Sequence, residues 1–147
     1  MHVEGVRVLP RAFTAIELTI VVAVVAVLSA IAMPTATRLL DRIRVRAAVT
    51  AIESMFGAAR HIAIARDTQS TVEIDTAAKV ISVTVATDTV RRAHVGADYG
   101  VSLMSNRLTT SYSATGLGYG AANLSIVVQK GSALDTIVVS RLGRVRH

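Results

Sequence analysis

The sequence has 147 residues, enough for one domain of ordinary size, and its lack of cysteine excludes disulfides, thiolate metal sites and cysteine nucleophiles. The formal net charge is +6, and arginine carries nearly all of the positive charge, because Lys79 and Lys130 are the only lysines. This balance fits anionic partners such as phospholipid headgroups or nucleic acid, and it equally fits a solvated basic surface.

An apolar segment begins at Phe13, after a basic stretch in which Pro10 opposes helix formation. Between residues 13 and 33 the only charged side chain is Glu17. A helix rises about 1.5 Å per residue, so this segment spans roughly 30 Å, the thickness of the hydrocarbon core of a bilayer. Because a backbone in lipid must satisfy its own hydrogen bonds, the pattern predicts a membrane-spanning helix.

Three kinds of N-terminal segment fit this pattern. The first is a simple signal anchor, and the second is a secretory signal peptide with a small-residue cleavage site at Ala30-Ile31-Ala32. The third is a prepilin, and Glu17 favours it. A carboxylate costs about 2.5–3.5 kcal/mol at the centre of a membrane helix and is usually functional there. Neither an anchor nor a secretory signal needs one.

The eleven-residue stretch AFTAIELTIVV, at 12–22, resembles the processing motif of prepilins of type IV pili and type II secretion systems. The resemblance implies that a prepilin peptidase cleaves between Ala12 and Phe13 and that Phe13 is then N-methylated. Counted from Phe13, Glu17 is the fifth residue and Pro34 the twenty-second, as the family pattern has them for assembly. Ala12 stands where the family nearly always has glycine, so we expect slower cleavage. Residues 1–12 would be the leader.

Positive charge is unequally distributed about the apolar segment, with more of it on the C-terminal side. A count of basic residues would leave the C-terminal part in the cytoplasm. The resemblance implies instead a single-pass protein of the bacterial inner membrane with a periplasmic C-terminal domain, and we adopt that orientation. The basic run fits contact with anionic lipid headgroups, or a solvated face with Asp41 paired to Arg44, which we favour. The arginines are Arg7 and Arg11 before the segment and Arg38, Arg42, Arg44 and Arg46 after it.

The segment 34–67 is predicted to be an amphipathic helix that continues the membrane helix. Pro34 should kink the helix or open its hydrogen-bonding ladder locally. Beyond it, apolar residues recur at spacings of four and three, which predicts a stripe that packs on a sheet. The predicted stripe is Leu39, Ile43, Ala47, Ala51, Met55, Ala59 and Ile62.

Residues 68–147 are predicted to form a β-rich domain outside the membrane. Alternating apolar residues predict strands at 70–75, 80–85, 89–95, 101–104, 124–129 and 136–139, with a hairpin turn at Gly131 and Ser132. The segment 111–121, rich in Ser, Gly, Ala and Tyr, is predicted to be a mobile surface loop. The fold class is therefore α+β, with a long N-terminal helix packed on an antiparallel sheet or pair of sheets.

No pattern of catalytic residues is found in the sequence. The histidines share no metal-ligand spacing with carboxylates, and no serine lies in a nucleophile elbow. The glycines around Leu117 lack the lysine and the strand–helix context of a phosphate-binding loop. We therefore predict neither enzymatic activity nor a cofactor nor a metal.

The last residues, 137–147, resemble the C-terminal end of the FimT/GspH family of minor pilins and minor pseudopilins, as does the segment 57–66. The resemblance implies one of two functions. One is a structural subunit of a type II secretion or type IV pilus filament, which we favour. The other is DNA binding for uptake, with Arg141, Arg144 and Arg146 on phosphates and Gly143 loosening the backbone between them.

A third reading, from a different class, is a membrane-anchored binding module that does not assemble. The assembling readings imply several partners: the prepilin peptidase and methyltransferase, other pilin or pseudopilin subunits, membrane lipid and, for the second function, DNA.

Overall fold

The computed structural model describes residues 13–119 and 123–147. The predicted leader, including Ala12, lies outside the described residues. Contacts divide the chain into two compact units, Met1–Ala36 and Thr37–His147, which are described separately below.

One helix, α1 (Ala15–Ala65), contributes to both units. Its helical geometry continues through Pro34, although this residue has no N–H to donate to the carbonyl of Ala30. In the first unit, hydroxyl side chains bond to backbone carbonyls one turn earlier: Thr19 Oγ1 to Ala15 O at 2.5 Å and Ser29 Oγ to Val25 O at 2.7 Å. These polar side chains are therefore satisfied within the helix, as an apolar environment requires.

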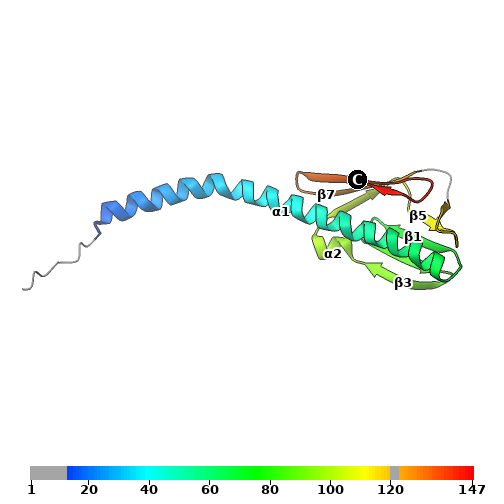
Figure 1. The fold of residues 1–147 in the computed structure, drawn as a ribbon. Coiled ribbons are helices and arrows are strands. Elements are labelled where there is room, and N and C mark those ends of the chain that lie inside the picture. Colours follow the sequence, from blue (N-terminus) through cyan, green and yellow to red (C-terminus); the bar gives the residue numbers. More distant parts are fainter. Residues whose placement is uncertain (1–12, 120–122) are drawn as a thin grey trace, which may run out of the picture. The chain divides into compact units, whose positions relative to one another are not determined.

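The second unit adds two antiparallel sheets and a short helix to the remainder of α1 (Figure 1). The first sheet has the strand order β3-β2-β1-β5-β6, and the second has the order β4-β7-β8-β9. In chain order the elements are β1 (Ser70–Asp75), β2 (Val80–Val85), β3 (Asp88–Ala93), α2 (Val95–Tyr99), β4 (Ser102–Ser105), β5 (Thr109–Tyr112), β6 (Gly118–Tyr119), β7 (Leu124–Lys130), β8 (Ala133–Val139) and β9 (Val145–Arg146).

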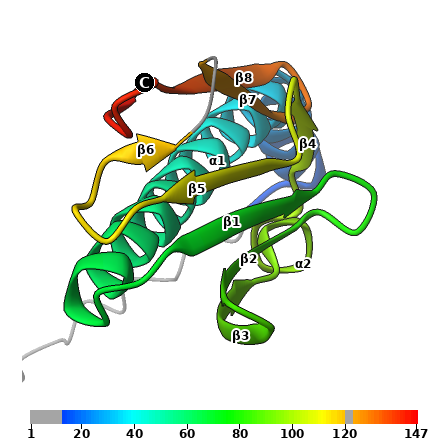
Figure 2. The same ribbon diagram turned by 90° about the vertical axis from the view of Figure 1, so that its right-hand side faces the viewer.

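The strand registers put apolar side chains on the inner faces of both sheets. In the first sheet, Val72 pairs with Val83, while the next pair, Glu73 and Ser82, faces outward. In the second sheet, Ile126 pairs with Ile137, and both are fully buried. Figure 2 shows both sheets lying along this part of α1, so that the helix and the inner faces share one core.

The apolar stripe predicted for α1 is wrong over its first half. Leu39 and Ile43 are 58% and 54% exposed, whereas Ile52 and Phe56 are fully buried. Repeated steps of four residues rotate the predicted row by about 40° per step, so it drifts away from the face that packs. The buried face consists of Val45, Ala48, Val49, Ile52, Met55, Phe56, Ala59 and Ala63.

Two predictions for the β-rich part also need correction. The predicted strand 89–95 ends at Ala93, and Val95 begins α2 because the amide of Gly96 turns to donate to Lys79 O at 3.0 Å. The segment 111–119 is not one surface loop, since it supplies the end of β5 and all of β6, with Tyr112 buried. The other predicted strands agree with the structure to within three residues at each end.

Candidate assembly helix and arginine groove

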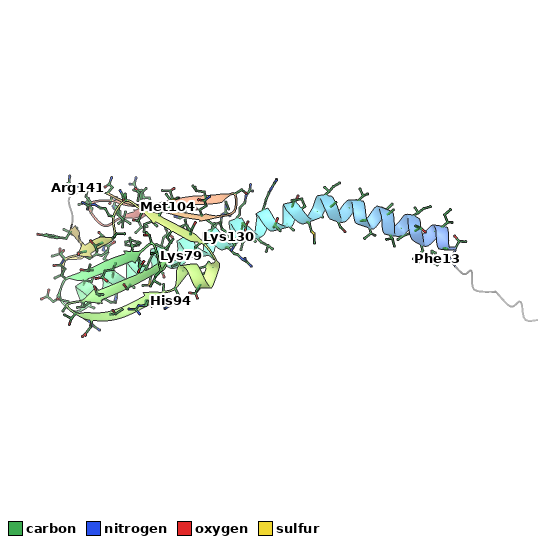
Figure 3. The ribbon with its side chains drawn as sticks, turned by 180° about the vertical axis from the view of Figure 1, so that it is seen from behind. Phe13, Lys79, His94, Met104, Lys130 and Arg141 are labelled. Atoms are coloured by element: carbon green, nitrogen blue, oxygen red, sulfur yellow. The ribbon has the colours of Figure 1, made fainter. Side chains whose placement is uncertain are left out.

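The start of α1 presents a capped helix terminus with an acidic residue in its first turn. Thr14 Oγ1 accepts a hydrogen bond from the amide of Glu17 at 3.3 Å, which satisfies one of the free amides of the terminus. Glu17 is exposed, and the partial positive charge of a helix N-terminus favours its carboxylate. Phe13 precedes the helix and is 78% exposed (Figure 3).

Within residues 13–36 the large apolar side chains have no cover. Ile16, Leu28 and Met33 are 71%, 60% and 72% exposed. Of the described helices, α1 is the one long and apolar enough, by length and composition, to cross a membrane. Apolar surface gains about 25 cal/mol per Å² on leaving water, so this segment requires lipid or other apolar helices around it.

The C-terminal segment, residues 140–147, folds into a tight turn followed by the edge strand β9. Ser140 N donates to Arg144 O and Gly143 N donates to Ser140 O, both at 2.8 Å. The hydroxyl of Ser140 also accepts from Arg144 N at 3.1 Å. Strand β9 then pairs with β8, Val145 opposite Val139. The glycine-arginine element is therefore ordered by its own hydrogen bonds.

Gly143 fixes the backbone here, so the prediction that it loosens the segment is wrong. Its φ is 78°, in the left-handed region, and it is buried. A Cβ at this position would collide with the ring of Tyr112, whose hydroxyl donates to Gly143 O at 3.2 Å. Burial raises the pKa of Tyr112 to about 12, against a smaller lowering by the charge of Arg60. The phenol therefore keeps its proton at neutral pH and remains a donor.

An open groove of about 480 Å³ lies between α1 and the C-terminal segment. Arg144 and Arg146 line it, and so does Arg60, from α1. The remaining lining residues are Glu53, Phe56, Gly57, Tyr112, Gly143 and Val145. Two of the three arginines predicted from the sequence are thus brought together, and the fold adds a third that sequence reasoning missed.

Arg141 does not line this groove. It lies in the turn after β8, where its amide donates to Asn123 Oδ1 at 3.2 Å, and its side chain is exposed at the periphery of the domain (Figure 3). Sequence proximity to Arg144 therefore does not make it part of the same surface.

Glu53 and His147 join the C-terminal segment to α1. His147 Nδ1 is hydrogen-bonded to Glu53 Oε1 at 2.8 Å, and among the described residues this is the one contact within 4.0 Å that becomes an ion pair when the histidine is protonated. The predicted pairing of Asp41 with Arg44 is therefore absent from the described residues. The carboxylate of Asp41 lies instead against the β7–β8 turn, 2.6 Å from where a Cβ of Gly131 would be. The described residues contain no group of three or more potential metal ligands.

Comparison with solved structures gives the architecture a counterpart in two crystal forms of the type IV minor pilin FimU from Pseudomonas aeruginosa strain PAO1. The first matches with a TM-score of 0.60 and 13% identity over 71% of this chain and 88% of that one. The second matches with a TM-score of 0.56 and 12% identity over 69% and 90%. The chain has a pilin-like fold. No family model and no curated protein matches its sequence.

Proposed function

We propose that this protein is a minor pilin or minor pseudopilin of the FimT/GspH type, a structural subunit of a type II secretion or type IV pilus filament. The observation that carries the proposal is the division of α1. The same helix has a wholly exposed apolar part with Glu17 in its first turn and, further on, a face buried under two sheets. The pilin-like fold supports the same conclusion.

In the proposed assembly, prepilin peptidase removes residues 1–12, and Phe13 supplies the new, methylated N-terminal amine. That amine approaches Glu17 of a neighbouring subunit among packed apolar helices. The attraction is strong in such surroundings, and it offsets the desolvation of both groups only when the geometry is good. Glu17 would therefore select the register in which subunits join.

The proposed location is the bacterial inner membrane, with the β-rich domain on the periplasmic side. Arg38, Arg42 and Arg46 follow the apolar segment, are exposed, and form no ion pair with a described residue. Spaced four apart, they share one helix face, where they can contact anionic lipid headgroups as the helix leaves the bilayer.

The variant Glu17→Gln tests this function, because it keeps the shape of the side chain and removes its charge. We expect it to insert into the membrane normally. Its amount in purified pilus or secretion filaments should fall at least about tenfold relative to the wild-type chain. Thr19→Ala, which removes an uncharged polar group two residues further along the same helix, is the matched control and should assemble. Equal incorporation of Glu17→Gln and the wild-type chain into filaments would contradict the role of Glu17. Absence of the wild-type chain itself from filaments would support instead a membrane-anchored module that does not assemble.

DNA binding for uptake is the second candidate function, and one observation favours it. Arg144 and Arg146 line the same open groove, are exposed and form no ion pair with a described residue. Binding to mixed-sequence duplex DNA should be lost in the double variant Arg144→Gln/Arg146→Gln. If the wild-type chain does not bind DNA even at low salt, the DNA-binding function is refuted and the filament function is the single remaining candidate.

A further inference from the structure

The groove beside the C-terminal segment gathers its guanidinium groups from two distant parts of the chain. Arg144 and Arg146 belong to the C-terminal segment, whereas Arg60 projects from α1. A short sequence motif cannot supply this third group, because the fold alone brings α1 against β9.

Two further observations place the side chain of Arg60. Its Nε lies 3.2 Å from where a Cβ of Gly116 would be, so it reaches the turn between β5 and β6. Its charge also acts on the hydroxyl of Tyr112, which is bonded to Gly143 O at 3.2 Å. Arg60 therefore lies next to the C-terminal turn rather than away from it.

The charges of the groove favour an anion. Arg60, Arg144 and Arg146 are exposed, and none forms an ion pair with a described residue. Glu53, the one carboxylate side chain in the lining, is engaged by His147 Nδ1 at 2.8 Å. Guanidinium groups present forked donors that match phosphate oxygens.

The shape and lining of the groove favour a nucleic-acid backbone without base readout. The groove is open, so a chain can pass along it. Its aromatic residues, Phe56 and Tyr112, are 0% and 1% exposed, and the hydroxyl of Tyr112 is already bonded. Neither ring can therefore stack on a base, which leaves the phosphates as the part of a nucleic acid that the groove can hold.

We propose that Arg60 is a phosphate-binding residue that completes a three-arginine DNA site with Arg144 and Arg146, in place of Arg141. This inference rests on the second function proposed above and adds a residue from outside the C-terminal segment. Such a site contacts the phosphates of DNA and not its bases. Duplexes of different sequence should therefore bind with similar affinity.

The test uses the full chain in an uncharged detergent and mixed-sequence duplex DNA over a salt series. Three phosphate contacts predict a slope of log affinity against log salt of about −2.7, which is roughly a 40-fold loss between about 50 and 200 mM. Arg60→Gln should weaken binding roughly tenfold and reduce the steepness of that slope by about one. Arg60→Lys keeps the charge and should retain most of the slope.

Two control variants define the site. Arg91→Gln removes an exposed arginine from β3, outside the groove, and should bind like the wild type. Glu53→Gln removes the opposing carboxylate from the groove and should strengthen binding. Thermal unfolding of each variant shows whether it is folded.

The outcomes separate this inference from the function on which it rests. If the wild-type chain does not bind DNA, both fail. If it binds, and the double variant at Arg144 and Arg146 does not, while folded Arg60→Gln matches Arg91→Gln in affinity and slope, the role of Arg60 is overturned and the DNA-binding function stands.

Discussion

At the scale of single residues, Gly143 and Tyr112 determine where the terminal arginines lie. The left-handed backbone of Gly143 makes the turn that starts β9, and the ring of Tyr112 occupies the space that a side chain at 143 would need. The sequence alone indicates a glycine before two arginines. It cannot indicate the contact with Tyr112, which lies on another strand and in a segment without a strong strand pattern.

Replacing Gly143 with alanine tests this contact. We expect Gly143→Ala to lower the free energy of unfolding by about 1–2 kcal/mol from the left-handed backbone alone, and by more if the ring of Tyr112 has to move. Gly57→Ala is the matched control, because Gly57 lies in α1 with nothing within 4 Å of an added Cβ. That variant should gain about 0.5–1 kcal/mol from helix propensity. Similar unfolding curves for the two variants would contradict the role given to Gly143.

The buried phenol of Tyr112 predicts a pH dependence at the alkaline end. Its pKa is raised from 10.0 to about 12 in the folded protein, so the folded state holds the proton more tightly than the unfolded chain does. The resulting stability is fully present below pH 10 and is lost as pH rises from 10 toward 12. Tyr112→Phe lacks this ionisation. Its unfolding temperature should therefore fall less than that of the wild type over the same interval, and parallel curves would refute the prediction.

At the scale of elements, alternating strands are predicted from sequence more accurately than the packing face of the helix. The strands β1 and β2 agree residue for residue, because alternation directly reports which side chains face inward. The helix face does not, since several overlapping apolar rows run along α1 and only contact with the sheets selects one. Sequence reasoning missed Arg60 for the same reason: its neighbours Gly116 and Tyr112 come from distant parts of the chain.

A pair of substitutions in α1 distinguishes the observed face from the predicted stripe. Ile52 is fully buried and Ile43 is 54% exposed. We expect Ile52→Ala to destabilise the β-rich domain by about 2–5 kcal/mol and Ile43→Ala to change its stability by less than about 0.5 kcal/mol. Denaturant titration of both variants in detergent measures the difference. A larger loss of stability for Ile43→Ala than for Ile52→Ala would show that the predicted stripe, and not the observed face, packs on the sheets.

At the scale of the whole molecule, the two units differ in what they expose. The first carries exposed apolar surface and Glu17, and the second carries a closed core and the arginine groove. The pilin-like fold agrees with the α+β architecture expected from the sequence.

We propose that this chain is a prepilin whose mature form begins at Phe13. The most direct test is mass spectrometry of the N-terminal peptide of the protein isolated from the membranes of its native host. We expect a mature chain that begins with N-methylated Phe13 and has Glu17 as its fifth residue. A chain that begins at Met33, as after a secretory signal, or one that keeps residues 1–12, would contradict it.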